Sequence, residues 1–201
     1  MTLSDSEMVN LYSLIKGRND FRKLEVNGLL LVEYTCMVEE TKFGIWSDNN
    51  YFAYVTSGKK MWKSIFHDYE VQQGDILFIK KGANLTHQFF DDEFCAIFLF
   101  IPDVFIKTFL QKYPDFLQAP QAQLTDQDSV LRVAPDPLLE NYFSSVASYL
   151  SLSKEPNKQL LALKFEELLI TVCSDKRHQA LHSYFASLNQ NRIHQIRTVM
   201  E

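Results

Sequence analysis

The sequence predicts an α+β protein in which a small β-barrel is followed by a layer of helices. Short apolar runs alternate with turn residues between positions 51 and 102, which is typical of successive strands. Gly74 and Asp75 precede the wholly apolar run 76–79, which indicates a strand covered on both faces. A second such run, 94–101, ends at Pro102, and proline has no N–H to give to a sheet. We expect the barrel to end there.

Two hairpins are expected in the barrel. Asn27 and Gly28 separate segments 21–26 and 29–37, and this residue pair suits the type I′ turn of a tight hairpin. Further along, Gly58 can adopt the positive φ that a turn between Val55 and Met61 requires. We therefore expect the strands on either side of Gly58 to pair with each other.

Helices are expected at both ends of the chain. Residues 4–7 match a capping box before a short N-terminal helix, which Gly17 interrupts. Asp103 can cap a second helix that Pro114 limits. After an aperiodic linker at 119–128 and one short strand at 130–133, Asp136 and the proline that follows it begin a third helix.

The segment 158–173 is predicted to be the most apolar helix. Its apolar residues extend well beyond one stripe, so this helix needs two neighbours, and one of them can be a second copy of the chain. A further amphipathic helix is expected at 177–188, with a break at 189–192. We predict that this helix makes a two-fold interface, either with one face or with its neighbour. The first face carries Leu161, Phe165, Leu168 and Val172, and the neighbouring face carries Leu160 and Leu169.

Composition argues against several classes of protein. The net charge of −5 disfavours a nucleic-acid surface, which depends on clustered Lys and Arg. No apolar run approaches the roughly 20 residues that span a bilayer, and the N-terminus lacks the features of a signal peptide. Cys36, Cys95 and Cys173 are widely spaced and lie in apolar runs, which indicates buried, reduced thiols. We expect a cytoplasmic protein without a membrane segment.

The order of these features resembles a known family. The pattern V-x-x-G-D-I-L-F-I-x-x-G-x(4)-H at 71–87 resembles the cupin barrel, and L-x-L-K-x-x-E-L-L-I at 161–170 resembles the N-terminal half of AraC-type transcription regulators. The resemblance spans roughly 24–188. It implies a cupin-like barrel with a C-terminal helical layer, which senses a small-molecule effector or a regulatory protein and forms a homodimer.

The resemblance also suggests how the chain is divided. We assign 1–20 to an N-terminal helix or arm, 21–118 to the barrel, and 119–188 to a helical dimerisation segment. Residues 189–201 would begin a linker to a DNA-binding helix-turn-helix domain that is absent from this chain. DNA would be contacted only through that domain.

Many cupins are metalloenzymes, but this sequence lacks their ligands. When Gly58 is aligned with the last glycine of the first metal motif, Tyr51 occupies the glutamate position and neither histidine position holds a histidine. In the second motif only His87 is available, two places late. One imidazole cannot hold a catalytic metal that needs three protein ligands. We therefore expect no metal, no cofactor and no catalytic residues.

Without a metal, a small barrel either fills with side chains or keeps a pocket for one ligand. The resemblance implies that His87 and Phe89 face the ligand. Trp46, Tyr54 and Trp62 are further candidates, because each has an apolar body and a polar group. Packing in the core or at a sheet edge is the simpler role for each of the five.

Two alternatives remain open from the sequence. One is a metal-independent enzyme that acts on a small sugar or keto acid, with His87 as the base and a tyrosine as the acid. The other is a domain with a filled barrel that binds a regulatory protein. The pair His178 and His182 could contribute to a zinc site only with a third ligand, and surface positions are the more usual role of such a pair.

Overall fold

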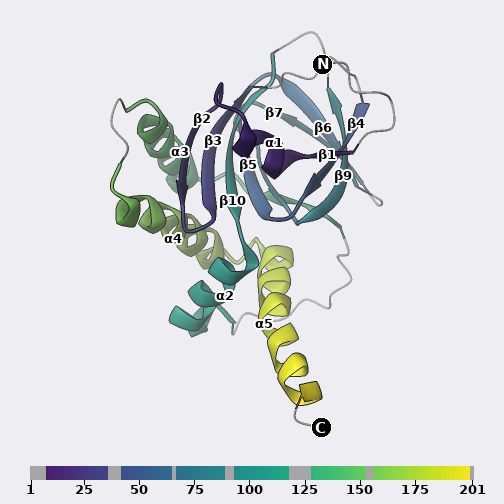
Figure 1. Cartoon of the computed structure of the whole chain (residues 1–201), viewed down its shortest axis with the longest axis vertical. Helices are drawn as coiled ribbons and strands as arrows, with labels where there is room; N and C mark the ends of the chain where they lie inside the picture. The colour runs from purple at the N-terminus through teal and green to yellow at the C-terminus, as the bar shows by residue number, and fades with distance from the viewer. Residues whose placement is uncertain are drawn as a thin grey trace.

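The computed structural model describes residues 8–35, 42–64, 67–88, 93–117, 128–152 and 156–199. In these ranges the strands form two sheets that face each other, and helices cover the outer side of the larger sheet (Figure 1). The chain therefore has the α+β architecture that the sequence predicts, with a barrel-like sandwich and a helical layer.

The smaller sheet has five strands in the order β1-β4-β9-β6-β7. Strand β1 pairs parallel with β4, and the other neighbours are antiparallel. The strands are β1 (Val9–Asn10), β4 (Lys42–Ser47), β6 (Lys59–Lys63), β7 (Asp68–Gln72) and β9 (Gly82–Gln88).

The larger sheet has six strands in the order β11-β8-β5-β10-β3-β2, and all of its pairs are antiparallel. Strand β11 comes from beyond Pro102 and pairs with β8, so the sheet does not end at Pro102 as we expected. The strands are β2 (Arg22–Val26), β3 (Leu29–Thr35), β5 (Asn50–Ser57), β8 (Ile76–Ile79), β10 (Cys95–Ile101) and β11 (Val130–Val133).

One expected hairpin is confirmed and the other is wrong. Strands β2 and β3 pair across Asn27 and Gly28, both of which have positive φ angles, of 50° and 80°. In contrast, β5 pairs with β8 and β10, whereas β6 pairs with β7 and β9. Gly58 therefore carries the chain from the larger sheet to the smaller one instead of closing a hairpin.

The larger sheet is buried on both faces. Along β3, Leu30 and Val32 belong to the core between the two sheets, whereas Leu29 and Leu31 belong to the core against the helices. This follows from the two-residue period of a strand, which sends alternate side chains to opposite faces. Apolar residues at consecutive positions are therefore expected wherever a strand has a layer on each side.

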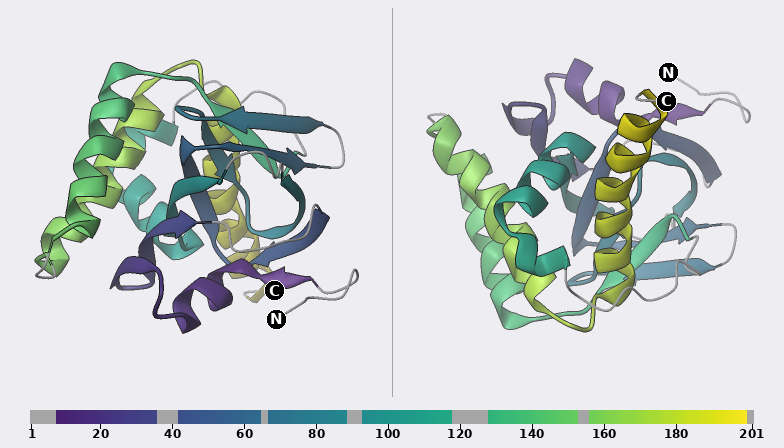
Figure 2. Two further views of the ribbon diagram at one scale, coloured as in Figure 1. Left: turned by 90° about the horizontal axis from the view of Figure 1, so that it is seen from above. Right: turned by 90° about the horizontal axis from the view of Figure 1, so that it is seen from below.

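Five α-helices and one 3-10 helix occur in the described ranges, and α5 lies across the end of the barrel beside α2 (Figure 2). None of these helices is both long and apolar enough to cross a membrane. The helices are α1 (Leu11–Gly17), α2 (Asp103–Lys112), η1 (Pro114–Leu117), α3 (Pro137–Leu150), α4 (Lys158–Ser174) and α5 (Gln179–Val199).

The helix starts agree only in part with the sequence. The Asp136 side chain caps α3 as expected, because it accepts a hydrogen bond from the Leu138 N–H at 2.7 Å. Helix α1 is instead capped by Asn10, and the proposed capping box at 4–7 lies outside the described residues. Asp103 is the first residue of α2 and makes no cap hydrogen bond, since its carboxylate is engaged by Asn50 and Lys81.

The expected break at 189–192 is absent, and α5 continues through this segment. Asn, Gln and Arg lower helix stability by less than about 1 kcal/mol each, unlike proline, so a polar run alone does not end a helix.

Candidate functional site

The inner face of β6 places a lysine inside the barrel. Lys60 and Trp62 point inward, and the Lys60 residue is only 2% exposed. The Lys60 ammonium lies 4.9 Å from the ring centre of Phe94 and 5.6 Å from those of Tyr34 and Trp62. At these distances the ring faces attract the positive charge. The barrel therefore contains a buried cation surrounded by aromatic rings.

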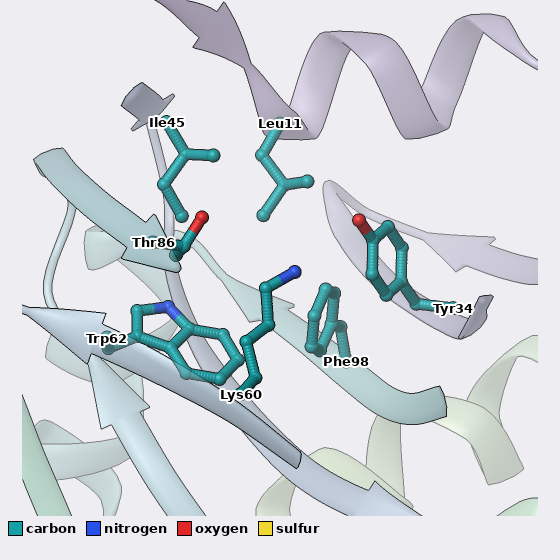
Figure 3. Close-up of a pocket in the computed structure, with 7 residues that line it drawn as sticks. All are labelled: Leu11, Tyr34, Ile45, Lys60, Trp62, Thr86 and Phe98. Carbon is teal, nitrogen blue, oxygen red and sulfur yellow. The ribbon is translucent and has the colours of Figure 1, made fainter. Parts of the chain in front are cut away.

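Polar groups converge on this part of the barrel. Figure 3 shows the Lys60 ammonium, the Tyr34 and Thr86 hydroxyls and the Trp62 indole nitrogen directed toward one space. Each of these groups can donate a hydrogen bond. Apolar side chains line the rest of the space, namely those of Leu11, Ile45 and Phe98.

The space itself is small. Its volume is about 10 Å³, which holds roughly one water molecule. Trp62 is 1% exposed, and its Nε1 has no hydrogen-bond partner within the described residues. A buried donor without a partner costs about 1 to 3 kcal/mol, so an acceptor in this space would be stabilised.

Tyr51 is a second buried polar group near Trp62. Burial raises the pKa of the Tyr51 phenol, and the neighbouring indole offsets only part of this effect. The Tyr51 hydroxyl has no hydrogen-bond partner in the described part of the chain. Because its pKa is raised, the phenol stays neutral. The Tyr51 hydroxyl and the Trp62 indole N–H thus leave unused hydrogen-bonding capacity inside the barrel.

Of the five residues proposed from the sequence, Trp62 lines this space. Trp46 is 41% exposed, and its indole N–H donates to the Asp48 carboxylate at 2.9 Å. Tyr54 stacks on Phe143 of α3, with ring centres 4.4 Å apart and planes 11° apart, so it lies in the layer between sheet and helices. Trp46 and Tyr54 are therefore not brought together with Trp62.

The two remaining candidates are not placed by the structure. His87 belongs to β9, where its backbone is opposite Lys42 and Met61, but its side chain is outside the described atoms. Phe89 lies outside the described residues.

The burial of Lys60 is not evident from the sequence, because Lys59 and Lys60 follow a turn, where lysines are usually solvated. The signal that could have found it is the two-residue period of a strand, which puts Lys60 on the same face as Trp62. Tyr34 could have been found in the same way, since it alternates with the buried Leu30 and Val32 on β3.

The predicted interface residues of α4 lie mostly in the chain's own core. Their side chains are buried except for that of Leu160, which is 45% exposed. Leu163, which was not in the predicted set, is 56% exposed on the same helix. The buried members are Leu161, Phe165, Leu168, Leu169 and Val172.

The paired histidines have structural surroundings. His178 is buried; its Nε2 accepts from the Ala134 N–H at 2.9 Å, so its Nδ1 carries the proton that is donated to the Val172 carbonyl at 3.0 Å. His182 is half-buried one turn later. In the described ranges, no three His, Cys, Asp or Glu side chains gather as a metal site would require.

Comparison with known families decides the assignment. The family model of the ExsA N-terminal regulatory domain matches residues 50–184, which is more than half of the chain. The chain belongs to this family. It is therefore the regulatory domain of an AraC-type transcription regulator, and the resemblance seen in the sequence is confirmed.

Solved structures support the fold of this ExsA-type domain. An apo form of a ToxT variant from Vibrio cholerae has a TM-score of 0.53 and 12% identity, and the match covers 74% of this chain and 56% of that one. The AraC-like transcriptional activator CuxR has a TM-score of 0.50 and 13% identity, with 76% and 54% covered. The chain thus spans about half the length of these proteins. A comparison with curated proteins found no significant match.

Proposed function

We propose that this regulatory domain senses a small acidic molecule inside its barrel. The observation that carries the proposal is the Lys60 ammonium, which is buried among aromatic rings and lies beside the donors of Tyr34, Trp62 and Thr86. A site rich in donors and positive in charge is complementary to a carboxylate, which only accepts hydrogen bonds when ionised.

Burial strengthens this preference. A charged group in a low-dielectric interior interacts more strongly with an opposite charge than it does in water. Burying a charge also has a cost, which a bound carboxylate beside Lys60 would reduce. The apolar walls formed by Leu11, Ile45 and Phe98 would contact the aliphatic part of a small acid.

The ligand-free space holds only about one water, so binding requires side chains to move. Lys60 has a flexible stem of four carbons, and rotation of this stem would enlarge the space without a change in the sheet. We therefore propose a carboxylate of a few carbon atoms as the class of effector.

Calorimetric titration with butyrate and with its neutral analogue butyramide tests this proposal. We expect butyrate to bind at least tenfold more tightly, and the Lys60→Met variant to lose that preference. The matched control is Lys59→Met, because Lys59 is the exposed neighbour on the same strand. Equal binding of the two compounds, or equal losses in both variants, would contradict the proposal.

The second candidate for what this domain senses is a regulatory protein that binds to it. The observation that favours it is the small volume of the space, since a barrel filled by its own side chains has no room for a ligand. If no small acid changes the melting temperature of the domain, contact with a protein becomes the better account.

We also propose that the domain forms a homodimer and that an attached DNA-binding domain reads DNA in the cytoplasm. The family supports a regulatory role for this chain. The exposed leucines of α4, Leu160 and Leu163, support a helix-to-helix contact between copies. The contact surface would then be the exposed face of α4 that carries Leu160, and the buried members of the predicted set would stay in the chain's own core.

Regulation is favoured over catalysis by the family assignment. If the chain were instead a metal-independent enzyme, it would turn over a sugar or keto acid, and the His87→Ala variant would lose that activity.

A further inference from the structure

The Asn50 side chain joins four segments of the molecule. Asn50 is fully buried at the start of β5. Its amide nitrogen donates to the Asp103 carboxylate at 2.8 Å and to the Ile101 carbonyl at 3.5 Å. Its amide oxygen accepts from the Lys81 N–H at 3.0 Å and from the Tyr184 hydroxyl at 2.6 Å. All four hydrogen-bonding positions of the amide are therefore used.

Each partner belongs to a different part of the fold. Lys81 lies in the turn between β8 and β9, Ile101 ends β10, and Asp103 begins α2. Tyr184 belongs to α5, the helix that extends away from the barrel toward the C-terminus (Figure 1). The Asn50 amide thus attaches α5 to the barrel through one short hydrogen bond.

Charged groups reinforce this attachment. The Lys81 ammonium pairs with the Asp103 carboxylate at 2.6 Å, and the Lys80 ammonium lies 5.0 Å from the ring centre of Tyr184. Burial, followed by the nearby Asp103 charge, raises the pKa of the Tyr184 phenol. The hydroxyl therefore keeps its proton, which it needs to act as the donor to Asn50.

The same strand connects Asn50 to the interior of the barrel. Tyr51 is the next residue of β5, and its ring packs in the inner core against Phe98 and Phe100, with ring centres 5.4 Å and 5.0 Å away. Phe98 lines the space beside Lys60. A change in the barrel that moves Phe98 or Tyr51 would therefore act on the residue that holds α5.

We propose that Asn50 and Tyr184 form the joint through which the state of the barrel interior sets the position of α5. The proposal rests on the proposed function only in treating the barrel as the sensing part. Asn50 and Tyr184 are positioning residues: they act on α5 and on whatever follows it in the chain, and they do not contact the effector.

The Tyr184→Phe variant isolates this joint. It removes the hydroxyl but keeps the ring that packs against Phe78 and Phe185, and Asn50 retains its bond from Lys81. Ser187→Ala is the matched control. It removes the 2.6 Å hydrogen bond from the Ser187 hydroxyl to the Tyr184 carbonyl, which is local to α5 and does not reach the barrel.

Hydrogen exchange of the whole chain measures the outcome without any ligand. We compare the amides of α5 in the natural chain, in Trp62→Phe, in Tyr184→Phe and in the double variant. Trp62→Phe alters the core between the two sheets, whereas α5 packs in the other core. We expect it to change α5 exchange at least threefold when the Tyr184 hydroxyl is present, and to have no effect in the Tyr184→Phe background. Ser187→Ala should preserve the response to Trp62→Phe.

The proposal is overturned if Trp62→Phe leaves the hydrogen exchange of the α5 amides unchanged. It is also overturned if Trp62→Phe changes that exchange equally with and without the Tyr184 hydroxyl. The second result would mean that the hydroxyl supports local stability only. Failure of butyrate to bind would refute the proposed effector and would not affect this result, because the cycle of variants uses no ligand.

Discussion

A side chain at Gly58 would collide with the backbone at Glu93. A β-carbon built on Gly58 lies 2.6 Å from the Glu93 carbonyl oxygen and 2.9 Å from the Phe94 Cα, and Gly58 has a φ of 74°. The neighbouring Ser57 hydroxyl donates to the same carbonyl at 3.2 Å. The passage from the larger sheet to the smaller one is therefore built on close contact between two backbone segments.

Gly58→Ala should destabilise the domain by about 2 to 4 kcal/mol, from the left-handed backbone and the steric overlap together. Gly17→Ala is the matched control, because nothing lies within 4 Å of the added carbon. The control should change the free energy of unfolding by less than about 1 kcal/mol. Urea unfolding measures both variants, and an equal effect would show that Gly58 is not sterically required.

The residue type marks Gly58 as a turn position but does not indicate which strands pair on either side of it. The positive φ is a local property, so the residue type reveals it. Strand pairing depends on segments far along the chain: β5 lies between β8 and β10, and β6 lies between β7 and β9. The Asn27–Gly28 hairpin was predictable because both of its strands are adjacent in sequence to the turn.

The exposed face of α4 should control self-association. We expect Leu163→Glu, alone or with Leu160→Glu, to convert a dimer to monomers in analytical ultracentrifugation. A charged side chain in an apolar contact loses solvation without a partner. Val104→Glu is the control, since Val104 is more exposed than either leucine but lies on α2. If all variants dimerise alike, the contact lies elsewhere.

Tyr54 should affect stability but not effector binding. Tyr54→Ala removes the stacking on Phe143 and should cost about 1 to 3 kcal/mol. Because the ring lies between the sheet and α3, the affinity for butyrate should stay within about twofold of the natural value, well below the factor of ten that 1.4 kcal/mol represents. Loss of binding with unchanged stability would place Tyr54 in the site after all.

Low pH should reduce the folding stability of the domain, in part through protonation of His182. Burial lowers the pKa of this imidazole below its ordinary value, so the unfolded chain binds the proton more readily than the folded one. The contribution to stability is therefore complete above a pH of about 6.5 and declines as the pH falls below that value. His182→Gln should flatten the loss of stability between about pH 7 and pH 5. An unchanged slope would assign the loss to other groups.

The candidate site was less predictable than the fold. Trp62 is a candidate from the sequence because of its apolar body and polar group, and it lines the space beside Lys60. Lys60 is harder to recognise, because a lysine after a turn suggests a solvated side chain. The two-residue period of β6 is the one local signal that puts it on the same buried face as Trp62. The role of Asn50 is not evident from the sequence, since the partners of its amide are 31 to 134 positions away.

Contacts between a small acid and the barrel interior test the central claim most directly. Nuclear magnetic resonance with carbon-13-labelled butyrate can detect nuclear Overhauser effects from its methylene protons to the chain. We predict effects to the Trp62 indole and the Phe98 ring, which both line the space beside Lys60. Effects to surface residues alone, or none at saturating butyrate, would contradict the account.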